Sequence, residues 1–293
     1  MGTSSSHSGP GDGPGLLPSW ATNGQGEDAG IAESASGDPD ARDGQAPDGN
    51  ATDIGGPVTV PSQTAHWRNA KSSMTRYAGS GGGGSNSGRL RSAGAGYTRA
   101  KGGSRSAAGA ARSGKAATGR LGGFLASTVG SGIGPALESV GLREVVGQSS
   151  DTVFARLVDK LAPSGSTKEE AAARRATVEV LSYLYETVVG ENGDMASLEG
   201  MDANTVEYAV ELSVSGYIYN MWLDELGLSI EKGAVSEAAA VRLEGEVREY
   251  VRSCVSLELG GKNVLDVNWH RPEGRGIIDR VFHDAYSVLE AAE

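Results

Sequence analysis

The chain has very few cysteine and aromatic residues for its length. It contains one cysteine, Cys254, among 293 residues, and Phe, Trp and Tyr together make up 5% of it. A single cysteine excludes an internal disulfide. With so few aromatic side chains beside 45 glycines, much of the chain is expected to lie outside a packed core.

Long apolar runs are also missing. A transmembrane helix needs about 18 consecutive apolar residues, and no such run occurs. The N-terminus lacks the basic and apolar regions of a secretory signal. We therefore expect a cytoplasmic protein that makes no contact with a membrane.

Catalytic motifs are absent as well. The sequence contains no GxxxxGK[ST] loop, GxSxG elbow, HExxH pair or CxxC pair. Cys254 lies in the apolar run VRSCVSLEL and is expected to be a buried, inert thiol. We expect no enzyme activity, no metal and no cofactor. A hydrolase that uses His270 and His283, which lie near acidic residues, remains a weaker alternative.

Charge is strongly segregated along the chain, whose overall net charge is −11. Residues 1–60 contain one Arg and nine acidic residues, and residues 61–120 contain eleven basic residues and no acidic one. Residues 121–293 contain fourteen basic and twenty-eight acidic residues. This alternation predicts a disordered acidic tail (1–60), a basic, partly helical docking segment (61–120) and an acidic all-α domain (121–293).

The first twenty residues stand out within the tail. They contain five glycines and three prolines, and their large apolar residues are Leu16, Leu17 and Trp20. Such a segment cannot bury enough surface to offset the entropy of ordering. Because Gly2 is small, removal of Met1 is expected to leave a free glycine amine. Leu16, Leu17, Pro18 and Trp20 are suited to be an anchor for a partner.

The basic segment is the strongest electrostatic signal. Its predicted docking surface consists of six arginines: Arg68, Arg76, Arg89, Arg91, Arg99 and Arg105. Such a surface can dock on an acidic protein. It can also bind nucleic acid through phosphates, with Trp67, Tyr77 and Tyr97 available for stacking. We favour a protein partner, because the rest of the chain is strongly acidic and would repel polyanions.

Helical periodicity begins in the basic segment. Apolar residues from Trp67 to Tyr77 recur at helical spacing, and the glycine run 81–84 is expected to end that helix. Residues 89–120 are rich in Ala, Gly, Ser and Arg, and short helices with breaks at 102–103 and Gly114 are predicted there. Because glycine lowers helix propensity, these helices should depend on packing against other parts of the molecule.

The C-terminal region predicts an all-α domain. Its valine-rich runs repeat with a period near 3.6 residues, which distinguishes them from strands. Four side chains are expected to cap helix N-termini: Asp151, Thr167, Asp202 and Ser236. The helix that begins after Asp202 is expected to end at Gly227, and a final helix is expected over residues 274–290.

Several of these segments together resemble a known family. The opening MGTSSSxxGPGxGxxLLPSW, a basic WR…A…Y element and the stretch RSAGAGYTRAKGGSRSAA…GRLGGFL precede an acidic helical region. This arrangement resembles the QatB family, a component of the Qat antiphage defence system of bacteria. The resemblance is most specific over residues 2–20 and 89–125.

The resemblance implies a function. QatB is accompanied by an ATPase (QatA), an enzyme similar to 7-cyano-7-deazaguanine synthase (QatC, QueC-like) and a TatD-like nuclease (QatD). The resemblance also implies that the chain is a non-catalytic protein substrate of the QueC-like enzyme. That class of enzyme activates the carboxylate of a 7-carboxy-7-deazaguanine with ATP, and the Gly2 amine would replace ammonia. The residues implied in recognition are Thr3, Ser4, Ser5, Pro10, Gly11, Leu16, Leu17, Pro18 and Trp20.

Overall fold

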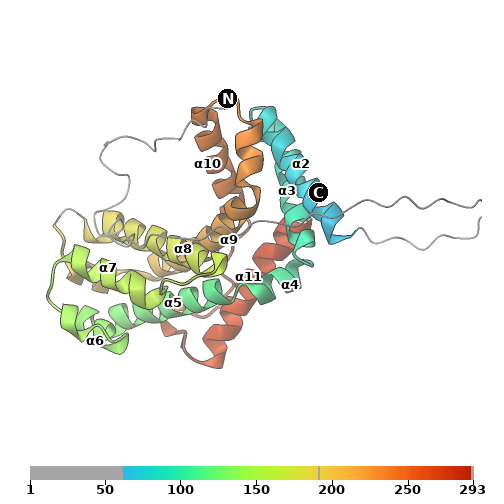
Figure 1. Cartoon of the computed structure of the whole chain (residues 1–293). Coiled ribbons are helices and arrows are strands. Elements are labelled where there is room, and N and C mark those ends of the chain that lie inside the picture. The colour runs from blue at the N-terminus through green and yellow to red at the C-terminus, as the bar shows by residue number, and fades with distance from the viewer. Residues whose placement is uncertain (1–61, 191, 292–293) are drawn as a thin grey trace, which may run out of the picture.

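The computed structural model describes residues 62–190 and 192–291, and every regular element within them is a helix (Figure 1). The α-helices are α2 (Gln63–Gly79), α3 (Ser87–Ala100), α4 (Ser104–Ala110), α5 (Arg112–Ser131), α6 (Ile133–Ser139), α7 (Ser150–Leu161), α8 (Lys168–Leu184), α9 (Ala203–Gly233), α10 (Glu237–Ser253) and α11 (Pro272–Ala291). Short 3₁₀ or π turns are η1 (Gly84–Asn86), η2 (Arg143–Val145), η3 (Tyr185–Val189), η4 (Met195–Gly200) and η5 (Val264–Asp266). The predicted all-α class is confirmed for the described residues.

Helix α9 runs through the middle of the molecule and packs against α2, α5, α8 and α10 (Figure 1). It has 31 residues, and all of residues 212–220 are buried. A helix that is buried on all sides needs small residues where its neighbours approach. Gly216 has this role, since a Cβ there would lie 3.3 Å from the Cβ of Ala176 on α8.

Helices α2 and α3 form an antiparallel hairpin that packs on the C-terminal half of α9. The two helices touch closely, because a Cβ on Gly96 would lie only 2.9 Å from the backbone nitrogen of Ala70. Between them, Gly81, Gly82 and Gly83 all have positive φ, at 79°, 68° and 85°. Residues with a Cβ disfavour this conformation. The glycine run therefore ends α2, as predicted.

Aromatic side chains join the hairpin to the core. The Tyr97 ring contacts Trp67 edge-on at 5.9 Å between centroids and stacks on Trp222 of α9 at 5.6 Å. Trp222 in turn meets Tyr250 of α10 edge-on at 6.1 Å. Tyr97 and Trp222 are both fully buried. The basic segment is thus ordered by packing on helices far away in sequence, as expected.

Helices α4 and α5 lie along α11. One of the two helix breaks predicted for this segment occurs at another residue. The chain breaks at 102–103, as predicted, and at Ala111, between α4 and α5. The predicted break at Gly114 is wrong, because Gly114 is inside α5 and buried. A Cβ on Gly114 would lie 2.7 Å from ring atoms of Tyr217. This glycine allows close approach between helices and does not end one.

Three of the four predicted N-caps are confirmed. The side chains of Thr167, Asp202 and Ser236 accept hydrogen bonds from backbone N–H groups at the starts of α8, α9 and α10. The fourth is wrong, because α7 begins after Ser149 and Asp151 lies within its first turn. An acidic residue there still favours the positive end of the helix dipole.

The end of α9 also differs from expectation. The helix continues past Gly227 to Gly233. The reason is tertiary packing, because Leu226 and Ile230 are fully buried and extend the apolar stripe toward α2. At Gly233, a Cβ would lie 2.6 Å from the Cβ of Ala78. Contact with the hairpin therefore outweighs the low helix propensity of Gly227.

Candidate functional site

The residues predicted to be modified and to bind the enzyme lie outside the described residues. They are Gly2 together with Thr3, Ser4, Ser5, Pro10, Gly11, Leu16, Leu17, Pro18 and Trp20. Their roles stay predictions, as does the division of the chain into tail, basic segment and acidic domain. Helix α5 continues through residue 120, where the charge of the sequence changes sign.

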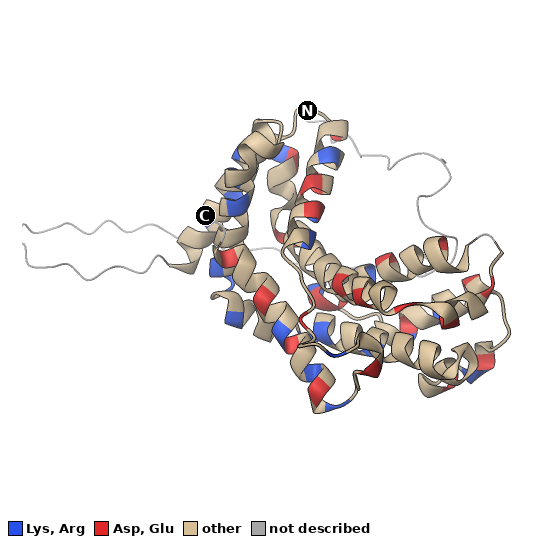
Figure 2. Cartoon of the chain, turned by 180° about the vertical axis from the view of Figure 1, so that it is seen from behind, with Lys and Arg blue, Asp and Glu red and all other residues tan. Residues whose placement is uncertain are grey.

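The six arginines of the predicted docking surface lie on three helices. Arg68 and Arg76 are on α2, Arg89, Arg91 and Arg99 are on α3, and Arg105 is on α4. All of them are exposed except Arg99, which is half-buried. Figure 2 shows Lys and Arg along the hairpin and most of the Asp and Glu on the other helices.

The structure brings some of these arginines together and separates others. Arg89 donates from Nη1 to the backbone oxygen of Arg76 at 3.3 Å, so these two charges share one end of the hairpin. Arg99 donates from Nη2 to the backbone oxygen of Glu290 on α11, also at 3.3 Å. The carboxylate of Glu290 accepts from the backbone N–H of Ser104 at 2.8 Å. Arg99 is thus bound to α11 and stands apart from Arg76 and Arg89.

Five exposed bases of the hairpin form no ion pair with any described residue. These residues, named here the hairpin basic surface, are Arg68, Lys71, Arg76, Arg89 and Arg91. Several bases of the later helices do form ion pairs, as Arg174 does with Asp159 at 2.7 Å. In the basic segment, Lys115 pairs with Asp279 at 2.8 Å.

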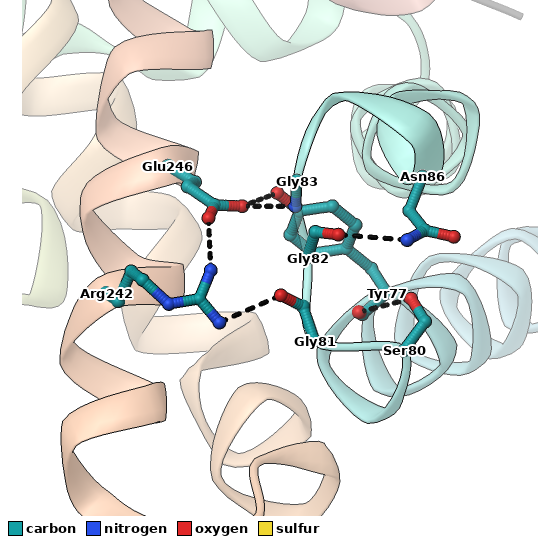
Figure 3. A network of polar contacts seen from close by, with 8 residues as sticks. All are labelled: Tyr77, Ser80, Gly81, Gly82, Gly83, Asn86, Arg242 and Glu246. Atoms are coloured by element: carbon teal, nitrogen blue, oxygen red, sulfur yellow. Dashed lines mark hydrogen bonds and ion pairs between the residues drawn. The ribbon is translucent and has the colours of Figure 1, made fainter.

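The turn of the hairpin is held by a polar network from α10 (Figure 3). The carboxylate of Glu246 accepts a short hydrogen bond from Tyr77 and another from the backbone N–H of Gly83 at 2.8 Å. Arg242 pairs with Glu246 at 2.6 Å and donates to the backbone oxygen of Gly81 at 2.8 Å. This network was not predicted from the sequence, although Arg242 and Glu246 are spaced for an i, i+4 ion pair.

Burial and these contacts set the ionisation of the two acidic groups in the network. Burial and the neighbouring carboxylate raise the pKa of Tyr77 well above its usual value. Burial alone would raise the pKa of Glu246. However, the hydrogen bonds from Tyr77 and Gly83 and the charge of Arg242 outweigh burial and lower it. Glu246 therefore binds the turn as a carboxylate at neutral pH.

A groove lies between the start of α5 and the connection from α7 to α8. It has a volume of about 330 Å³ and adjoins a second hollow of about 490 Å³, with Arg112, Ser113 and Glu170 lining both. Glu170 is held by the backbone N–H and the hydroxyl of Thr167 at 3.0 and 2.8 Å, so its carboxylate caps α8. This groove could not be predicted from the sequence, because its walls come from segments far apart in the chain.

The histidines of the alternative hydrolase site do not come together. His270 precedes α11 and His283 lies within it, which places them about 20 Å apart along the helix axis. The Nδ1 atom of His283 lies 3.1 Å from Asp284. Among the described residues, no three His, Cys, Asp or Glu side chains are placed to hold a metal ion.

Cys254 lies at the end of α10 and is buried, as predicted. Its Sγ donates to the backbone oxygen of Tyr250 at 3.3 Å. Burial raises the pKa of the thiol, and hydrogen bonds together with the charge of Arg91 only partly oppose this effect. A buried thiol with a raised pKa is a poor nucleophile.

Comparison with known proteins assigns the family. Residues 102–289 match the family described as QatB, Qat anti-phage system associated protein. The chain belongs to the QatB family. No curated protein and no solved structure is similar enough to this QatB-family chain to match it.

The match to the family begins after the hairpin of α2 and α3. The matched region runs from residue 102, just before α4, to residue 289 in the last turn of α11, so α2, α3 and the preceding residues lie outside it. It includes nearly all of the C-terminal helical region, where the sequence resemblance is least specific. None of the described helices is both long and apolar enough to cross a membrane.

Proposed function

We propose that this QatB-family chain is a non-catalytic subunit of the Qat defence system and that its Gly2 amine is conjugated to a 7-deazaguanine. The observation that carries the proposal is a glycine directly after Met1 in a chain whose helical region belongs to this family. The enzyme would be the QueC-like partner of the system. The ATPase and the TatD-like nuclease are the other proposed partners.

The chemistry requires an amine in its neutral form, and a primary amine enters a narrow active site most easily. The α-amino group has a pKa of about 7.7–8.0, so a sizeable fraction is neutral near pH 7. The Gly2 nitrogen attacks the ATP-activated carboxyl carbon of 7-carboxy-7-deazaguanine and forms an amide. The activating group leaves, and the amine loses its proton to solvent. Glycine suits this step, because it has no side chain to obstruct a narrow active site.

Recognition is proposed to use two regions of the chain. Thr3, Ser4 and Ser5 keep the end of the tail narrow enough to enter the active site. The segment from Pro10 and Gly11 to Leu16, Leu17, Pro18 and Trp20 binds the enzyme surface. The hairpin basic surface contacts an acidic surface of a partner, since no described carboxylate of the chain itself neutralises it.

A reconstituted reaction tests this function. The chain without Met1 is mixed with the QueC-like enzyme, ATP and 7-carboxy-7-deazaguanine, and its mass is followed. Gly2→Pro should abolish conjugation, because proline makes the amine secondary and fixes φ. Gly2→Ala is the control that keeps a primary amine. Equal conjugation of the Gly2→Pro chain would contradict the proposal.

The anchor is tested separately from the amine. Trp20→Ala should weaken binding of the enzyme while leaving the helical structure unchanged, because Trp20 precedes the described helices. Binding is measured by calorimetry, and the fold by circular dichroism. Unchanged affinity would remove Trp20 from the recognition segment but leave the role of Gly2 intact.

Nucleic-acid binding is the second candidate. The observation that favours it is the hairpin basic surface, whose five bases are exposed and form no ion pair with any described residue. Submicromolar binding of duplex DNA at physiological salt, with a salt slope that corresponds to several phosphates, would support it. We expect negligible binding, because the other helices are acidic and repel a polyanion.

A further inference from the structure

The hairpin carries positive charge that the described residues leave unneutralised. Helices α2 and α3 contain no Asp or Glu, and residues 62–120 contain none either. The bases of the hairpin basic surface are exposed and lie on two helices that pack against each other (Figure 2). Arg76 and Arg89 are near neighbours, which raises the local positive potential.

The carboxylates that contact the two ends of the hairpin already have partners. Glu246 is bound by Tyr77, Gly83 and Arg242 at the hairpin turn. Glu290, at the other end of the hairpin, accepts from the backbone N–H of Ser104. Neither carboxylate forms an ion pair with a base of the hairpin basic surface. The hairpin basic surface is therefore a set of exposed bases on two packed helices that form no ion pair within the described part of the molecule.

An oppositely charged segment is attached directly to this face. Residues 21–60 contain eight acidic residues and one arginine, and they end just before the N-cap of α2, Ser62. Asp53 lies nine residues before Ser62, which allows a reach of about 30 Å. Helix α2, with 17 residues, is about 25 Å long. The acidic residues can therefore reach the whole face.

We propose that acidic residues 27–53 bind in cis to the hairpin basic surface and shield it from polyanions. The covalent connection gives them an effective concentration in the millimolar range, so an acidic partner surface reaches the same bases by displacing them. Single exposed ion pairs are weak, so the contact depends on the number of charges and on salt. It requires no ordered structure in the acidic segment. The proposal does not depend on the conjugation of Gly2.

Removal of the acidic charges of residues 27–53 should expose a surface that binds polyanions. In the test variant, the eight acidic residues of 21–60 are replaced by Asn or Gln, so the length of the segment is unchanged. Binding of a short labelled DNA duplex is measured by fluorescence anisotropy at about 50 mM salt. We expect the neutralised chain to bind at least about tenfold more tightly than the natural chain and to lose this binding at high salt. Equal affinities would overturn the proposal.

Charge reversal on the hairpin identifies the surface responsible. Added to the neutralised chain, Arg76→Glu with Arg89→Glu should abolish the gain in DNA binding. The matched control is Arg156→Glu with Lys160→Glu on α7, which changes the charge equally at exposed sites in another part of the molecule (Figure 1). Equal loss in both variants would mean that net charge, and not the hairpin, determines binding, and the proposal would fail.

A second readout detects the contact in the natural chain. In ¹⁵N-labelled protein, amide resonances of residues 27–53 should shift between about 50 and 500 mM salt, because the ion pairs are screened. The Arg76→Glu, Arg89→Glu double variant should show much smaller shifts, and the α7 control should behave like the natural chain. Salt-dependent shifts that are the same in all three proteins would overturn the cis contact.

Discussion

Tyr97 of α3 stacks on Trp222 of α9, with ring centroids 5.6 Å apart and an angle of 18° between the ring planes. Tyr97 lies outside the region that matches the QatB family, and Trp222 lies inside it. Both side chains are fully buried. The hairpin therefore shares one hydrophobic core with the family region, although it lies outside the family match.

This contact should be important for stability. Tyr97→Ala removes a buried ring from between Trp67 and Trp222 and should lower the free energy of unfolding by about 3–5 kcal/mol. Tyr97→Phe keeps the ring and should cost far less. Urea unfolding monitored by circular dichroism measures both values. An equally small effect of both variants would show that the hairpin does not contribute to the core.

Two glycines of α5 should respond in opposite ways to alanine. Gly114→Ala should destabilise the protein, because the new Cβ would lie 2.7 Å from the ring of Tyr217. A Cβ added at Gly130, in the same helix, would meet no neighbouring atom within 4 Å. Gly130→Ala should therefore be neutral or stabilise by up to about 1 kcal/mol. Thermal unfolding compares the two, and a stabilising Gly114→Ala would contradict the close contact.

Glu246 should make stability depend on pH in the acidic range. Its pKa in the folded chain is below the usual value, which is about 4.3 in an unfolded chain. The ionised carboxylate therefore stabilises the fold above that pH, and this contribution is lost as the pH falls through the folded pKa. Glu246→Gln should be less stable than the natural chain by about 1 kcal/mol at pH 7. The difference should shrink below about pH 4, and a pH-independent difference would contradict this account.

The hairpin should contribute to complex assembly. Arg89→Glu with Arg91→Glu should weaken association with the other Qat components, because both side chains are exposed on α3 and have no described ion pair. Co-purification from cells that express the complete system measures this effect. The α7 variant Arg156→Glu with Lys160→Glu is the charge-matched control. Equal recovery of both variants would exclude the hairpin as a docking surface.

The sequence predicts the helical class because apolar residues repeat at helical spacing. Its N-cap residues can also be identified from the few residues around each helix start. Thr167, Asp202 and Ser236 cap helices as expected, since capping depends on neighbours only a few residues away. Gly114 and Gly227 differ from the prediction, because their roles depend on distant helices. In the sequence, a glycine indicates a break in a helix. In the structure, Gly114 lies inside a helix and leaves room for the ring of Tyr217.

The candidate site is less predictable than the fold. The sequence predicts a docking surface of six arginines, but it does not reveal that Arg99 donates to the backbone oxygen of Glu290, which is 191 residues away in sequence. Likewise, Tyr77 and Glu246 meet across 169 residues. Periodicity reports only which face of a helix is buried. It cannot report which helix covers that face or which carboxylate neutralises a given base.

The mass of the N-terminal peptide tests the central proposal most directly. The chain is co-expressed with its genomic neighbours, digested with trypsin, and the peptide that ends at Arg42 is analysed by mass spectrometry. We predict that Met1 is absent and that the Gly2 nitrogen carries an amide-linked 7-deazaguanine. An unmodified glycine amine, in the presence of an active QueC-like enzyme and its deazaguanine precursor, would contradict the account.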